Sequence, residues 1–232
     1  MIKNRVFRSV TAALVVCVAL VMTSCDLDGD DVQPIPAAYV TLYNASPNSP
    51  ELGIVVDGRQ INSYPFDYAD NTGYLRFYTG NRNIKFSPFG ASNAVIDTTV
   101  TLKDQHGYSI FVVGQYEQAD VVILNDSSSA AAAGKAKIRF VNLSPDAAPV
   151  ALREKNATSS ITENLSFKGA SEFIEVDAKE YDFEVVSSGG EPALNLSDIN
   201  VREGTFRTII VRGYRTPPSG NTNVISAEII NN

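Results

Sequence analysis

The sequence has no tryptophan and little methionine, cysteine or histidine. Its 232 residues include 2 Met, 2 Cys and 1 His, against 15 Gly and 11 Pro. A helical bundle would have more Leu, Met and Ala at helical spacing, so this composition favours a chain rich in strands and turns. With 44% hydrophobic residues, the chain has enough apolar side chains to bury a core.

The same scarcity excludes several kinds of site. His106 is the single histidine, and no GxSxG segment supplies the nucleophile of a Ser/His/Asp triad. One His and two Cys are too few for an ordinary zinc site, and neither GxGxxG nor GxxxxGK occurs to bind phosphate. The sequence therefore predicts a protein that is not an enzyme, with no catalytic residue, metal or cofactor.

The first 24 residues have the pattern of a secretory signal. Lys3, Arg5 and Arg8 precede the apolar run Thr11–Met22, which ends just before Cys25. A membrane-spanning helix needs roughly 20 apolar residues, whereas a signal peptide needs roughly 7 to 15. The order resembles the lipobox of bacterial lipoproteins, which implies cleavage before Cys25 and lipid attachment to that cysteine. An ordinary secretory peptide with a chance cysteine is the alternative.

Residues 25–37 form an acidic stretch with two prolines, which predicts a disordered tether. Aspartates after the cysteine resemble the signal that sends lipoproteins to the outer cell surface in some Gram-negative lineages. In other lineages, Asp directly after the cysteine retains the protein in the inner membrane. We expect a protein of the cell envelope, anchored by lipid in the outer membrane and exposed at the surface.

The charge balance argues against nucleic acid as a partner. Without Lys3, Arg5 and Arg8, 16 of the 19 Lys and Arg remain against 26 Asp and Glu, a net charge of −10. Nucleic acids and anionic membrane surfaces are bound by clustered Lys and Arg, and no such cluster is visible along the chain.

The remaining chain contains an internal repeat. The segment Val40–Pro50 matches Ile138–Ala148 at an offset of 98, and the offset is 99 further along, pairing Phe77 with Val176. This predicts two domains, which we call the first repeat (38–126) and the second repeat (135–232), joined by a linker at 127–134. Because each has its own apolar strands, we expect each to fold alone.

Each repeat shows about seven short strands separated by turn residues, with Asp57-Gly58 as the clearest hairpin turn. This spacing predicts an all-β fold of two tandem immunoglobulin-like antiparallel β-sandwich domains, with a small barrel as the alternative. In the first repeat, strands are expected near 39–44, 52–57, 73–78, 83–87, 95–102, 108–113 and 120–124.

The repeated N-x-S-P-(D/N) segment, followed by strands that end near Gly114 and Gly213, carries a family resemblance. The chain resembles the domain of unknown function 4397 over both repeats. The resemblance implies an exported or lipid-anchored bacterial protein with tandem β-sandwich domains, and no activity is established for the family. From composition alone, Ser-Pro-Asn in the first repeat and Ser-Pro-Asp in the second suit a turn.

Eight of the ten tyrosines lie in the first repeat. Leu75 and Phe77 match apolar residues of the second repeat and should point inward, which turns Tyr74 and Tyr78 outward. The predicted ligand face comprises Tyr39, Tyr43, Tyr64, Tyr68, Tyr74, Arg76 and Tyr78. Ordinary cross-strand packing, or cover from the neighbouring domain, is the alternative explanation for these rings.

These patterns favour a surface binding or adhesion module whose ligand is a glycan or a protein. Two other hypotheses are a structural subunit of an outer-membrane assembly and a hydrolase with an unrecognised site, because paired carboxylates such as Asp67 and Asp70 occur.

Overall fold

The computed structural model describes residues 34–188 and 194–232. The chain divides into the units Met1–Ile35 and Pro36–Asn232, and the strands described below lie in the second unit. The predicted signal peptide, the lipid attachment site Cys25 and the tether up to residue 33 lie outside the described residues and stay predictions. In the described part of the chain, no helix is long and apolar enough to span a membrane.

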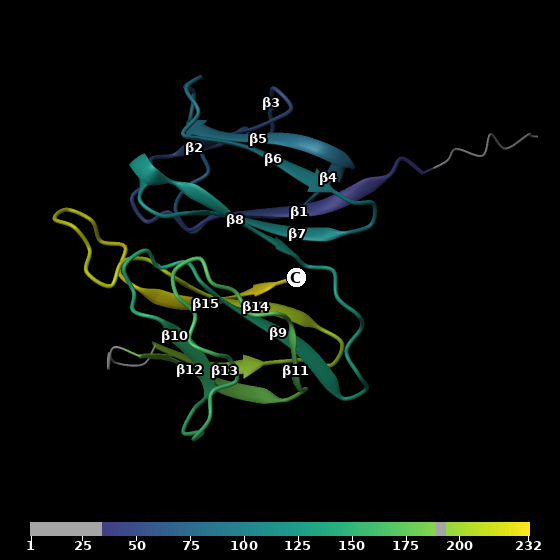
Figure 1. Cartoon of the computed structure of the whole chain (residues 1–232), viewed down its shortest axis with the longest axis vertical. Coiled ribbons are helices and arrows are strands. Elements are labelled where there is room, and N and C mark those ends of the chain that lie inside the picture. The colour runs from purple at the N-terminus through teal and green to yellow at the C-terminus, as the bar shows by residue number, and fades with distance from the viewer. Residues whose placement is uncertain (1–33, 189–193) are drawn as a thin grey trace, which may run out of the picture. The chain divides into compact units, whose positions relative to one another are not determined.

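The first repeat forms two four-stranded sheets (Figure 1). One has the order β4-β1-β7-β8, and its strands are β1 (Ala37–Asn44), β4 (Asn71–Tyr78), β7 (Gly107–Val113) and β8 (Asp120–Asn125). The other has the order β3-β2-β5-β6, and its strands are β2 (Leu52–Val56), β3 (Arg59–Gln60), β5 (Gly80–Pro88) and β6 (Ile96–Leu102). A single 3-10 turn, η1 (Tyr116–Gln118), lies between β7 and β8.

The second repeat reproduces this arrangement. One sheet has the order β11-β9-β14-β15, with β9 (Lys135–Asn142), β11 (Ile174–Asp177), β14 (Phe206–Arg212) and β15 (Ser226–Asn231). The other has the order β10-β12-β13, with β10 (Val150–Glu154), β12 (Glu180–Ser187) and β13 (Leu194–Asn200). The duplicated sequence therefore folds into duplicated sheets.

Each repeat has its own apolar core between its two sheets. In the first, Val40 and Ile110 from one sheet pack with Ile84 and Phe86 from the other, and all four are fully buried. Alternate residues of each strand supply this core, because successive side chains of a strand point to opposite faces. The prediction of an all-β sandwich fold is confirmed.

One strand pair in each repeat is parallel, which the expected antiparallel sandwich does not include. β1 pairs with β4 antiparallel and with β7 parallel, and β9 pairs in the same way with β11 and β14. Hydrophobic alternation has the same period in both orientations, so it gives no information on strand direction.

A third apolar cluster is shared by the two repeats. Its buried members lie on strands of the β4-β1-β7-β8 and β11-β9-β14-β15 sheets or directly after β1 and β9: Tyr43, Ala45, Phe111, Val113, Val122, Val141, Leu143, Ile210 and Ile230. Beside it, Arg139 forms an ion pair of 2.6 Å with Asp126, and both side chains are almost fully buried. Separate folding of the repeats stays a prediction, and each repeat alone would expose this cluster.

The repeated Asn-x-Ser-Pro segment has the same structural role in both repeats. The Asn44 side chain accepts a hydrogen bond from the Ser46 amide at 3.2 Å and donates one to the Phe66 carbonyl at 3.3 Å. The Ser46 hydroxyl then donates to the Gly114 carbonyl at 2.8 Å. Both side chains are completely buried. The segment thus ties the end of β1 to the end of β7, in agreement with the turn expected from composition.

Candidate ligand-binding site

The structure distributes the seven residues of the predicted ligand face over several places. Tyr43 points away from the core of its own sandwich, as expected, but is only 2% exposed. Its ring packs against Phe111, and its hydroxyl donates a hydrogen bond of 2.6 Å to Glu228 of the second repeat. Tyr43 therefore cannot contact a ligand, because the second repeat covers it. The alternation of residues along a strand does not show which other part of the protein covers Tyr43.

Tyr68 and Tyr74 also contact the second repeat. The guanidinium of Arg212 lies over the ring of Tyr68 at 4.9 Å. The Tyr74 hydroxyl accepts a hydrogen bond of 3.3 Å from Asn232 of the second repeat and donates one of 2.6 Å to Asp126, the carboxylate that pairs with Arg139. Burial, followed by the hydrogen bond to Asp126, raises the pKa of the Tyr74 phenol well above its ordinary value. Tyr74 thus belongs to a structural network.

Tyr39, Tyr64 and Tyr78 are the most exposed tyrosines of the predicted face, at 45%, 82% and 66%, and Tyr74 is 38% exposed. Tyr39 lines a cavity of about 470 Å³ together with Tyr74 and Phe206. Tyr64 lies in the segment between β3 and β4, outside the cavities described here. Tyr78 and Arg76 line a different and larger cavity. The structure therefore does not bring Tyr74 and Tyr78 to one site, although both are exposed on β4 as predicted.

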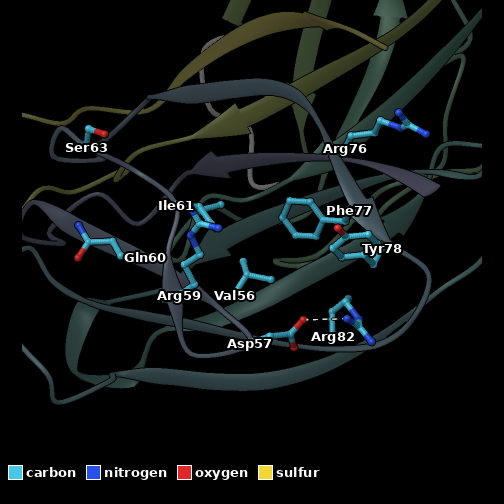
Figure 2. A pocket seen from close by; sticks show the side chains of 10 residues that line it. All are labelled: Val56, Asp57, Arg59, Gln60, Ile61, Ser63, Arg76, Phe77, Tyr78 and Arg82. Atoms are coloured by element: carbon cyan, nitrogen blue, oxygen red, sulfur yellow. Dashed lines mark hydrogen bonds and ion pairs between the residues drawn. The ribbon is translucent and has the colours of Figure 1, made fainter. Parts of the chain in front are cut away.

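That larger cavity, of about 630 Å³, is the best candidate site, and we call it the groove. It lies at one edge of the first sandwich, between β4 of one sheet and β2, β3 and β5 of the other (Figure 2). Its lining residues are Val56, Asp57, Arg59, Gln60, Ile61, Ser63, Arg76, Phe77, Tyr78 and Arg82.

The hairpin turn at Asp57-Gly58 shapes one end of the groove. Val56 pairs with Arg59 across this two-residue turn, and Asp57 and Gly58 have φ values of 49° and 82°. Both values are left-handed, which is typical of the tight turn that Asp-Gly favours between antiparallel strands. The predicted hairpin is confirmed, and it places the Asp57 carboxylate beside β5.

Asp57 holds Arg82 in a fixed position. The Asp57 carboxylate accepts hydrogen bonds from Nη1 of Arg82 and from the amide of Asn83, both at 2.9 Å. The second terminal nitrogen of Arg82 makes no hydrogen bond within the described residues, and its side chain is 26% exposed. One guanidinium nitrogen is therefore anchored while another can bind an acceptor.

The centre of the groove is apolar. Phe77 is 8% exposed, whereas Ile61 and Tyr78 expose 38% and 66% of their surfaces. Figure 2 shows Val56 and Phe77 between Arg59 on one side and Tyr78 with Arg82 on the other, while Arg76 points away from them. The groove thus combines an apolar surface that fits a ring with guanidinium and amide donors around it.

The residues that sequence reasoning missed are Asp57, Arg59, Ile61 and Arg82. Asp57 lies in the turn between β2 and β3, Arg59 on β3, Ile61 just after β3 and Arg82 on β5, so no short motif contains all four. One signal was present, because the second repeat has Tyr181 at the position of Arg82. Comparison of charged positions between the repeats would have found it.

Other candidates for chemistry lie elsewhere. Nδ1 of His106 is 2.8 Å from the carbonyl of Asp104 in its own turn, so the ring is engaged locally. Within the residues that the structure describes, no group of three His, Cys, Asp or Glu side chains could hold a metal ion.

The fold and the groove define a protein of tandem β-sandwiches with a concave candidate site at one edge of its first repeat. The chain belongs to the family described as Domain of unknown function (DUF4397), whose profile matches residues 38–153. The match spans the first repeat and the start of the second, whereas the expected resemblance covered both repeats. No curated protein matches the chain in sequence.

Several solved structures show a weak likeness. A family 26 carbohydrate-binding module of Amy13K from Eubacterium rectale, in complex with maltoheptaose, is 11% identical, with a TM-score of 0.26 over 79% of this chain and 100% of its own. A streptococcal virulence factor that binds alpha-glucan is 12% identical, with a TM-score of 0.24 over 82% and 96%. A Parabacteroides distasonis protein provisionally assigned to cell adhesion is 9% identical, with a TM-score of 0.22 over 85% and 99%. At these TM-scores the likeness carries no functional argument.

Proposed function

We propose that this chain is a binding module of the cell envelope, anchored by lipid at Cys25, that holds a glycan in the groove of its first repeat. The observation that carries the proposal is the combination of an exposed Tyr78 ring with polar donors around an apolar floor. A sugar ring has apolar faces that pack on aromatic side chains and hydroxyl groups that need hydrogen-bond partners. The groove offers both kinds of contact.

The proposed module is not an enzyme. Of the residues that line the groove, Asp57 is the one carboxylate, and it is already bonded to Arg82 and Asn83. Hydrolysis of a glycosidic bond ordinarily uses two carboxyl groups on opposite sides of the bond. The described lining of the groove has no second one to complete such a pair, which supports binding without turnover.

The lipid anchor is supported by the sequence signal before Cys25. Mass spectrometry of the amino-terminal peptide of the protein purified from membranes tests it. The expected result is a chain that begins at an acylated Cys25. A free thiol at Cys25, or a chain that begins at another residue, contradicts the anchor.

Glycan binding is tested with an array of neutral and acidic oligosaccharides and the detergent-purified protein. The wild type should bind at least one oligosaccharide, and Tyr78→Ala should weaken that binding at least about tenfold, as expected for an aromatic side chain that carries an interface. The matched control is Tyr64→Ala, which removes an even more exposed ring that does not line the groove and should bind normally. A wild type that binds no sugar, or a Tyr78→Ala variant that binds normally, overturns the proposal.

A further inference from the structure

The two repeats place opposite charges at equivalent strand positions. Arg76 lies opposite Tyr39 in the β1 and β4 pair, and Glu175 lies opposite Lys137 in the β9 and β11 pair. One step further on the same outward face, Tyr78 corresponds to Asp177. The register of paired strands, and not only the sequence offset, therefore establishes that acids replace Arg76 and Tyr78 in the second repeat.

The residue at the position of Arg82 also differs between the two repeats. Arg82 lies opposite Val100, and its equivalent Tyr181 lies opposite Ile199. Tyr181 is 5% exposed and stacks on Phe183 with ring centroids 4.8 Å apart. An apolar ring thus occupies in the second repeat the position from which a guanidinium lines the groove in the first.

The equivalent acid of the second repeat is already engaged. Asp177 forms an ion pair of 2.6 Å with Lys135, so its negative charge is balanced by a neighbouring cation of the second repeat. In the first repeat, Arg59 makes no ion pair within the described residues, and it is exposed beside the groove. Among the described residues, Arg59 is thus an exposed cation without an ion pair beside the groove, whereas Asp177 of the second repeat is paired with Lys135.

The charge of the groove is opposite in sign to the net charge of the protein. The whole chain carries a net charge of −7, so its surface as a whole repels anions. Arg59 and Arg82 against Asp57 leave the groove with an excess of positive charge. Guanidinium groups bind carboxylate and sulfate well, because their planar donors form two parallel hydrogen bonds to such groups.

We infer that the groove binds an acidic sugar, and this inference rests on the proposed glycan-binding function. Arg59 and the unbonded terminal nitrogen of Arg82 bind the carboxylate or sulfate group of the sugar. The ring of the sugar packs on Tyr78 and Phe77, and Asp57 keeps Arg82 in position.

The test compares pairs of oligosaccharides that differ in charge and share their rings. Suitable pairs are oligogalacturonate and its methyl ester, sialyllactose and lactose, and chondroitin sulfate oligosaccharides before and after desulfation. In at least one pair the acidic member should bind about tenfold or more tightly, and the difference should shrink as salt increases. Arg59→Gln should abolish the difference, and Arg59→Lys should restore part of it.

The control variant is Arg202→Gln, which removes the same charge from an exposed arginine of the second repeat and should leave the difference unchanged. Equal binding of acidic and neutral members would overturn the acidic-sugar inference but leave glycan binding intact. Absence of binding to every sugar would overturn the proposed function itself. A charge preference that Arg59→Gln leaves intact, or that Arg202→Gln removes equally, also contradicts the inference, because the anion would then bind elsewhere or by general attraction.

Discussion

At the scale of single residues, buried amides and hydroxyls explain why one short segment recurs in both repeats. Asn142 accepts a hydrogen bond from the Ser144 amide at 3.1 Å and donates one to the Leu165 carbonyl at 3.0 Å. The Ser144 hydroxyl donates to the Gly213 carbonyl at 2.7 Å. A buried backbone group without a hydrogen-bond partner costs free energy. These side chains stabilise the turn because they bond backbone groups of residues that lie outside the strands.

We therefore expect Asn142→Ala to lower the free energy of unfolding by about 2 kcal/mol, because the buried Ser144 amide loses its partner and the Leu165 carbonyl keeps only its bond from the Val150 amide. Urea denaturation followed by circular dichroism measures the change. Asn195→Ala, at an exposed position of β13, is the control and should change stability by less than about 0.5 kcal/mol. Equal effects of the two variants would refute a structural role for the repeated segment.

At the scale of strands and turns, alternation along one strand was predictable and the pairing of strands was not. The prediction that Leu75 and Phe77 point inward on β4 while Tyr74 and Tyr78 are exposed agrees with the observed burial. The parallel pairing of β1 with β7 depends on a chain crossover of more than 60 residues, which no local pattern encodes. Turns with positive φ values lie between these two cases, because glycine marks many of them but residues such as Asp57 and Lys168 adopt a positive φ as well.

Gly213 shows how strictly one turn demands glycine. Its φ is +84°, and a Cβ atom there would lie 2.4 Å from the carbonyl oxygen of Val224. Gly220 has the same φ of +84°, with no atom within 4 Å of its Cβ position. We expect Gly220→Ala to cost about 1 to 2 kcal/mol for its left-handed backbone, and Gly213→Ala to cost clearly more, roughly 3 kcal/mol or above. Thermal and urea unfolding of both variants measures the difference. Equal losses of unfolding free energy would mean that the backbone near Val224 moves to make room for the added methyl group.

At the scale of the whole Pro36–Asn232 unit, contacts between the repeats decide which predicted residues are accessible. Tyr43 and Tyr74 were predicted to face outward, and they meet Glu228 and the Asp126–Arg139 pair there. Sequence periodicity identifies the face of a strand but not what covers it, so the ligand face was predicted too large. The groove was missed for the converse reason, since Arg59 and Arg82 come to line one cavity only when β5 pairs with β2.

Because of Tyr43 and Tyr74, we expect the free energy of unfolding to fall at alkaline pH. Burial, then the hydrogen bond to Glu228, raises the pKa of Tyr43, and burial, then the hydrogen bond to Asp126, raises the pKa of Tyr74. A raised folded-state pKa means that the stabilisation is complete below the unfolded value of about 10 and is lost as pH rises above it. Unfolding free energies between pH 8 and 12 should fall less steeply for Tyr43→Phe and Tyr74→Phe than for the wild type. Variants that keep the wild-type slope would contradict this origin of the pH dependence.

The central claim is that the groove of the first repeat binds an acidic sugar. Hydrogen exchange of the purified protein, with and without the acidic oligosaccharide that binds most tightly among the three pairs, tests it most directly. Slower exchange should be confined to the amides of residues 56–63 and 76–82, with no change at the equivalent positions 175–181 of the second repeat. Protection that appears in the second repeat, or that leaves residues 56–63 and 76–82 unchanged, would contradict the claim.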